Sequence, residues 1–110
     1  MELNPQCEIT IKEARSNYVW VRGTSASYKF VAKVYCAGSK HGIDKGRISK
    51  FAVWINLDER GRERWIARYD RGWDVYTKQG HRQFVDYIIG LLEAMPQPEE
   101  LKTGMCFPFD

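Results

Sequence analysis

The stretch YKFVAKVYC, residues 28–36, alternates between two kinds of side chain. One face of an extended chain would carry Tyr28, Phe30, Ala32 and Val34. The other face would carry Lys29, Val31, Lys33 and Tyr35. Alternation with a period of two predicts a β-strand that buries one side and exposes the other.

Similar runs on both sides of this stretch predict an antiparallel meander of about four or five strands. Further strands are expected at residues 7–13, 17–23, 48–56 and 64–70, and the last either continues past Gly72 or bends away there. In the run 48–56, Phe51, Val53 and Ile55 share a face with Ser49. The opposite face holds Lys50, Ala52, Trp54 and Asn56. Small polar residues at 24–27 and a polar segment at 57–63 are expected turns.

A single helix should follow the strands. Thr77 is a plausible N-cap, an apolar stripe at helical spacing runs from Phe84 to Met95, and Pro96 ends it. The fold class is therefore α+β, an antiparallel meander with one C-terminal helix packed on one face. Residues 1–98 are expected to form a single domain. Residues 99–110 form a tail that either packs through its apolar side chains, Leu101, Met105, Phe107 and Phe109, or docks on a second chain.

Composition bounds the class of protein. The chain has 110 residues, 44% hydrophobic and 14% aromatic, which fits one globular domain. The three cysteines, Cys7, Cys36 and Cys106, lack metal-ligand spacing, so we expect reduced thiols and no metal or cofactor. The first residues show no signal peptide, and no apolar run approaches the roughly 20 residues that cross a bilayer. A cytoplasmic protein without membrane contact is expected.

The formal net charge of +3 is mild, but basic residues gather in the glycine-rich segment AGSKHGIDKGRISK, residues 37–50. Its glycines, Gly38, Gly42 and Gly46, could turn the backbone and expose N–H groups to an anion. Candidate ligand-binding side chains in and beside it are Ser39, Lys45, Arg47, Ser49 and Lys50. The competing interpretation is an ordinary hairpin loop whose glycines adopt positive φ.

A second candidate segment is ARYDRGWD, residues 67–74. Arg71 could hold a phosphate with two parallel hydrogen bonds, and Trp73 could stack on a ring. Alternatively, an internal Arg–Asp pair fixes a bend at Gly72. Trp54 lies on the lysine-rich sheet face, where it could stack a base while lysines contact phosphates, or simply be part of a solvent-facing sheet.

No catalytic residues are predicted. The two histidines, His41 and His81, lack a partner at a spacing that defines acid–base chemistry, and no motif fixes a nucleophile beside a base. We therefore expect a protein that is not an enzyme.

The segments GIDKGRISKF (42–51) and YDRGWD (69–74), in this order and followed by one helix, resemble a family of uncharacterised small proteins. These occur in clostridia-like Firmicutes and in their phages or prophages. The resemblance covers roughly residues 28–95. It implies a phage or mobile-element context and carries no assigned activity.

Two functions remain open. The first is a small phage-type binding protein, with an anti-defence role, that takes a nucleotide, a cyclic nucleotide signal or a nucleic acid through the basic loop. The second is an inhibitor of a host defence nuclease, or an assembly factor, that docks on a protein through an edge strand or the tail. In either case self-association is expected, because a short meander has exposed edges.

Overall fold

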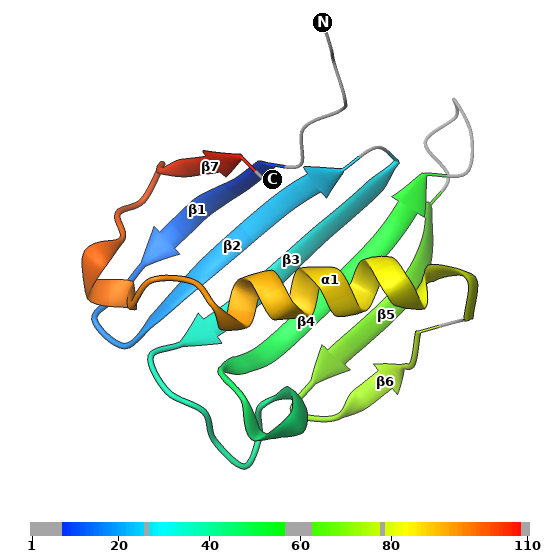
Figure 1. Ribbon diagram of the computed structural model, residues 1–110, viewed down its shortest axis with the longest axis horizontal. Helices are drawn as coiled ribbons and strands as arrows, with labels where there is room; N and C mark the ends of the chain where they lie inside the picture. The colour runs from blue at the N-terminus through cyan, green and yellow to red at the C-terminus, as the bar shows by residue number, and fades with distance from the viewer. Residues whose placement is uncertain (1–7, 26, 57–62, 78, 109–110) are drawn as a thin grey trace, which may run out of the picture.

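The computed structural model describes residues 8–25, 27–56, 63–77 and 79–108 (Figure 1). Within these residues the chain forms a seven-stranded sheet in the order β6-β5-β4-β3-β2-β1-β7, and every neighbouring pair is antiparallel. The strands are β1 (Glu8–Ala14), β2 (Tyr18–Ser25), β3 (Tyr28–Tyr35), β4 (Ile48–Asn56), β5 (Glu63–Asp70), β6 (Trp73–Val75) and β7 (Cys106–Pro108). The helices are α1 (Arg82–Glu93) and three short 3₁₀ turns, η1 (Ile43–Lys45), η2 (Gln79–His81) and η3 (Pro98–Glu100).

The α+β class and the antiparallel meander are confirmed, but the expected strand count of four or five is too small. The two additional strands, β6 and β7, have three residues each. A run of three residues shows no alternation, so only pairing with a neighbour defines such a strand. Cys7, Phe109 and residues 57–62 of the expected turn at 57–63 lie outside the described residues.

The segment after residue 98, expected to be a separate tail, contributes to the sheet. Its strand β7 pairs with β1, and Ile9 lies opposite Phe107. Leu101 is buried, and the half-buried Met105 and Phe107 pack against the core. The two outermost strands therefore have three residues each. Among the described residues, β6 pairs with β5 only at Arg68 and Tyr69, so the rest of β5 forms the edge on that side.

The alternation of β3 separates the two faces of the sheet as expected. Phe30, Ala32 and Val34 are buried, whereas Lys33 and Tyr35 lie on the opposite side and are half-buried. A β-bulge between β3 and β4 pairs Lys33 with Lys50 but Val34 with Ile48. Ser49 is thus the extra residue, and Ile48 enters the core with Phe51. An extra residue re-aims neighbouring side chains, which the alternation of 48–56 alone did not indicate.

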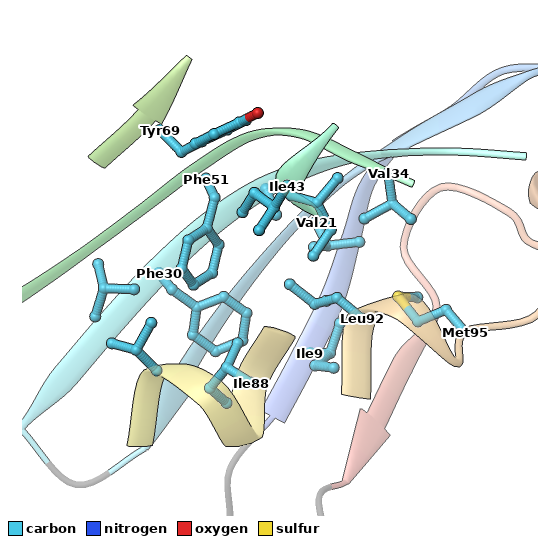
Figure 2. Packing of buried hydrophobic residues seen from close by; sticks show 14 of the residues in the cluster. Ile9, Val21, Phe30, Val34, Ile43, Phe51, Tyr69, Ile88, Leu92 and Met95 are labelled. Carbon is cyan, nitrogen blue, oxygen red and sulfur yellow. The ribbon is translucent and has the colours of Figure 1, made fainter. Parts of the chain in front are cut away.

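Helix α1 lies across one face of the sheet (Figure 1) and buries Val85, Ile88 and Leu92. A helix of this length extends about 18 Å, whereas seven strands span about 29 Å across the sheet. Residues outside the helix complete the core: Ile43 from η1, and Met95 and Leu101 from the chain after α1. Figure 2 shows Ile88 and Leu92 facing Phe30 and Phe51 from the sheet, with Met95 beside the end of the helix.

The helix begins later than the sequence indicated. Its N-cap is His81 rather than Thr77, and residues 79–81 form the 3₁₀ turn η2 first. Gly80 lies inside this turn, and glycine lowers helical propensity by about 1 kcal/mol. Thr77 is buried instead of capping. Among the described helices, none is long and apolar enough to cross a bilayer.

Replacing Gly90 with alanine should stabilise the protein. Gly90 lies on the exposed side of α1, and an added Cβ would meet no atom within 4 Å. We expect Gly90→Ala to raise the free energy of unfolding by about 0.5–1 kcal/mol, measured by urea denaturation. Ile88→Ala, two residues away in the core, should lower it by about 2–5 kcal/mol. A loss of stability in Gly90→Ala would contradict this placement of the helix.

Candidate ligand-binding site

The sheet face opposite α1, called here the open face, carries a pocket of about 410 Å³ where β3 ends and β4 begins. We call it the lysine pocket. Its lining residues are Asn17, Lys33, Tyr35, Cys36, Ala37, Ser39, His41, Ser49, Lys50 and Arg71. The described lining residues include three basic side chains, Lys33, Lys50 and Arg71, and none that is acidic. The pocket is therefore a local concentration of positive charge in a protein whose overall formal charge is only +3.

Two of these cations face each other directly. Lys33 of β3 and Lys50 of β4 are cross-strand partners. Like charges at directly opposed positions destabilise a sheet. The Lys33 ammonium lies 4.3 Å from the ring centroid of Tyr18 and 5.1 Å from that of Tyr35. The negative faces of these rings attract the ammonium, but a ring carries no net charge and does not neutralise it.

Lys50 has an acidic residue, Asp70, as its register partner on β5. Asp70 does not line the pocket. Among the described residues, no salt bridge within 4.0 Å involves Lys33, Lys50 or Arg71. Within the part of the chain that the structure describes, the three cations therefore converge on one cavity without an ion-pair partner.

Arg71 reaches the pocket from the turn between β5 and β6. Its φ of 60° lies in the left-handed region, which costs a residue other than glycine about 1–2 kcal/mol. Its backbone N–H donates to the carbonyl of Ser49 at 3.1 Å, which fixes the turn beside β4. The ion pair expected in this segment instead joins Arg68 to Asp74 at 3.8 Å. The side chain of Arg71 is thus not used to hold the bend.

The glycines of the loop have a different role from the one expected. Gly42 and Gly46 have φ of −78° and −89°, and the left-handed positions are Asp44 and Lys45, at 51° and 62°. A Cβ on Gly42 would collide with the carbonyl of Gly46. A Cβ on Gly46 would collide with the carboxylate of Glu93. Glycine is needed at these two positions because other atoms of the protein approach the backbone closely there. It is not needed for a positive φ or for an open anion-binding cradle.

The N–H groups of the loop are largely occupied inside the protein. Ser39 donates to Gly46, Gly42 to Ser39, Lys45 to Gly42, and Gly46 to Ile43, at 2.8–3.2 Å. The loop therefore folds on itself and does not present a concave set of free donors to a ligand.

Arg47 connects this loop to the end of α1. Its backbone N–H lies 3.0 Å from each carboxylate oxygen of Glu93. Its guanidinium donates to the carbonyls of Tyr35 at 2.7 Å, Glu93 at 3.0 Å, Met95 at 2.7 Å and Pro96 at 3.3 Å. The last carbonyls of a helix lack partners within it and attract cations. Arg47 satisfies them and so has a structural role, turned away from the lysine pocket.

Four of the predicted ligand-binding residues come together and four do not. Ser39, Ser49, Lys50 and Arg71 line the lysine pocket. Lys45 is exposed elsewhere on the loop, and Arg47 is bonded to the helix end. Trp73 packs edge-on against Tyr69 and Tyr76, at 5.1 and 5.0 Å between ring centroids. Trp54 lines a separate pocket farther along the open face.

Sequence reasoning placed Lys33 and Tyr35 on the open face and offered Tyr35 as a ring that could stack a base, but it did not assign Lys33 to the site and it missed Asn17. Asn17 lies in the β1–β2 turn, and its carbonyl accepts the Cys36 N–H at 2.9 Å, so the turn sits against the end of β3. The register between residues 28–36 and 48–56 could have paired Lys33 with Lys50. The position of Asn17 depends on the β1–β2 turn, which no motif marks.

Tyr69 is a further residue that supports the pocket. Its hydroxyl donates to the carbonyl of His41 at 2.8 Å, linking β5 to the loop (Figure 2 shows its position). Burial raises the pKa of Tyr69 above its ordinary value of 10.0, and the Asp44 carboxylate raises it further. Both effects favour the protonated hydroxyl that makes this bond.

The fold and the pocket define a small α+β protein with a basic open sheet face. The chain belongs to the family described as Domain of unknown function (DUF7678), which matches residues 19–93. The match includes both sequence segments, 42–51 and 69–74, and does not bear on a phage origin. No curated protein and no solved structure gives a significant match.

Removing the Arg47 guanidinium should destabilise the fold. Arg47→Ala leaves several carbonyls without a donor, and we expect a loss of about 2–3 kcal/mol in the free energy of unfolding. Arg47→Lys should recover only part, because one ammonium cannot replace a planar fork of five donors. Chemical denaturation measures both. If Arg47→Ala kept the stability of the protein but lost phosphate binding, Arg47 would be a ligand-binding residue, as the sequence predicts.

The stability of the protein should fall in alkaline solution in a way that depends on Tyr69. The folded state holds this proton at a pH where the unfolded chain releases it, so the contribution is complete below about pH 10 and is lost as the pH rises through the folded pKa. Absorbance titration should show one late tyrosine that Tyr69→Phe removes. Superimposable titrations of the two proteins would contradict the raised pKa.

Proposed function

We propose that this protein is a non-enzymatic binding protein that takes a phosphate-bearing ligand in the lysine pocket. The observation that carries the proposal is the direct opposition of Lys33 and Lys50, with Arg71 beside them and no acidic residue in the lining. Such an arrangement opposes folding unless an anion compensates it. The ligand classes are those expected from the sequence: a nucleotide, a cyclic nucleotide signal or a nucleic acid.

The residues have distinct roles in this proposal. Arg71 presents the planar fork suited to two phosphate oxygens, and the lysines contribute compact charges. The Ser39 hydroxyl and the Asn17 amide offer neutral hydrogen bonds, and Tyr35 offers a ring beside the cations. The pocket volume of about 410 Å³ lies within the range of small-ligand sites.

The sequence resemblance to phage and prophage proteins supports a phage or prophage setting for this protein. In that setting it would act in the bacterial cytoplasm, sequestering a host defence signal or shielding a nucleic acid from a nuclease. Self-association remains part of the proposal, and the part of β5 that β6 does not pair offers an edge for a second chain.

A specific observation also supports the second function, docking on a host protein. Trp73 and Tyr76 are 37% and 51% exposed at the β6 edge, and Arg82 stacks on Tyr76 with its guanidinium 4.8 Å from the ring centroid. Tryptophan, tyrosine and arginine dominate interface energetics. Tyr76→Ala should then abolish capture of a partner from a host lysate while leaving phosphate binding unchanged.

The lysine pocket can be tested by thiol protection, because Cys36 lines it. Cys106 is exposed on β7 and serves as the control thiol in the same molecule. Mass spectrometry would follow alkylation of both with ATP or a cyclic dinucleotide present. We expect a bound ligand to slow alkylation of Cys36 and not of Cys106. No protection and no thermal shift with any of these probes at low salt would overturn the proposal.

Arg71→Gly should separate function from stability. Glycine accepts φ of 60° without strain, so the thermal midpoint should stay equal or rise. Loss of the guanidinium should weaken binding about tenfold to a hundredfold, the equivalent of about 1.5–3 kcal/mol. Lys102→Ala removes one exposed cation outside the pocket and should leave binding unchanged. Equal weakening in both variants would indicate a general charge effect.

A further inference from the structure

The open face carries a second pocket, which the sequence motifs do not include. Its volume is about 520 Å³. We call it the tryptophan pocket, and its lining residues are Thr10, Lys12, Arg22, Gly23, Thr24, Lys29, Phe30, Val31 and Trp54. Its described lining residues again include three cations and no acid.

The two pockets lie along the same face and are joined by β3. Lys29, in the tryptophan pocket, and Lys33, in the lysine pocket, alternate with buried residues and so point to the same side. Four residues of strand separate their Cα atoms by about 13 Å. That distance corresponds to about four nucleotides stacked as in one DNA strand. A single mononucleotide would not occupy both pockets.

Aromatic rings accompany the cations across this face. Trp54 lines the tryptophan pocket and lies edge-on to Trp65, 5.2 Å between ring centroids, and Trp65 is 45% exposed. Trp20 and Tyr18 of β2 flank Lys33, whose ammonium is 5.8 and 4.3 Å from their ring centroids. Alternating rings and cations suit unpaired bases that stack while phosphates meet lysine and arginine. Paired bases in a duplex keep their faces covered.

We propose that the open face binds a single-stranded nucleic acid that runs from the lysine pocket to the tryptophan pocket. This inference rests on the proposed function, because the lysine pocket is one end of the path. It adds three further cations, making six among the described lining residues of the two pockets, a length of several nucleotides and a preference for unpaired bases.

One carboxylate borders this path and makes the inference testable. Glu63 accepts a hydrogen bond from Trp54 Nε1 at 2.9 Å and lies 3.9 Å from the Lys29 ammonium. A phosphate entering the tryptophan pocket would meet this negative charge. Glu63→Gln should therefore strengthen oligonucleotide binding severalfold and leave binding of a mononucleotide in the lysine pocket unchanged.

The main experiment is fluorescence anisotropy of a labelled oligothymidylate of about twelve nucleotides, with unlabelled thymidine monophosphate and a duplex of equal length as comparisons. Binding is measured from about 50 to about 200 mM salt, where each phosphate contact to a single strand contributes a slope of about −0.7 in log K against log salt. Six contacts give a slope of about −4, and the lysine pocket alone gives about −2. Combined Arg22→Ala and Lys29→Ala should reduce the slope by about 1.4, and Lys102→Ala should not change it.

The outcomes separate this inference from the proposed function. A steep slope, tighter binding of the single strand than of the duplex, and weakening on Trp54→Leu support it. If the monophosphate binds but the oligonucleotide binds no tighter, with the same slope, the extended path is overturned and the lysine pocket stands. Equal binding of duplex and single strand also overturns it. If neither the monophosphate nor the oligonucleotide binds, both proposals fail.

Discussion

One helix covers one face of a sheet that is wider than the helix is long. The apolar stripe of α1 buries only the middle strands, so the core is completed by Ile43 from the β3–β4 loop and by Leu101 after the helix. Arg47 links that loop to the helix end, because its guanidinium donates to backbone carbonyls of Glu93 and Met95 that would otherwise lack a hydrogen-bond donor. Gly42 and Gly46 allow the close approach that this fastening needs. The basic loop therefore contributes to the hydrophobic core before any role in binding is considered.

The same constraint decides where a ligand can meet the protein. The alternation that buries Phe30 beneath α1 sends Lys29 and Lys33 to the other side of the sheet. Two features there oppose stability: the facing lysines of β3 and β4, and the left-handed backbone of Arg71. Local conflicts of this kind tend to occur at functional sites. Their convergence on one pocket is the physical basis for the proposed phosphate ligand.

Much of the fold could be predicted, because long strands and amphipathic helices have periodic patterns. The faces of residues 28–36 and the helical stripe near Ile88 follow directly from spacing. The short edge strands could not be predicted, since three residues have no period and are defined by their partners. The site was predicted in part: Ser39, Ser49, Lys50 and Arg71 come together, whereas Arg47 is used by the helix. Composition does not reveal which cationic side chains already form hydrogen bonds within the fold.

The amino-acid sequence by itself determined the class of fold, the two faces of the meander and the position of the covering helix, because side-chain periodicity acts locally along the chain. Only the tertiary structure decided what the loop glycines do, since close approach and positive φ produce the same residue preference. It also decided that Ser49 is the extra residue of a bulge, because a bulge exists only in the pairing of two strands. The proposed binding surface extends across five strands and depends on contacts between distant residues, which no local pattern contains.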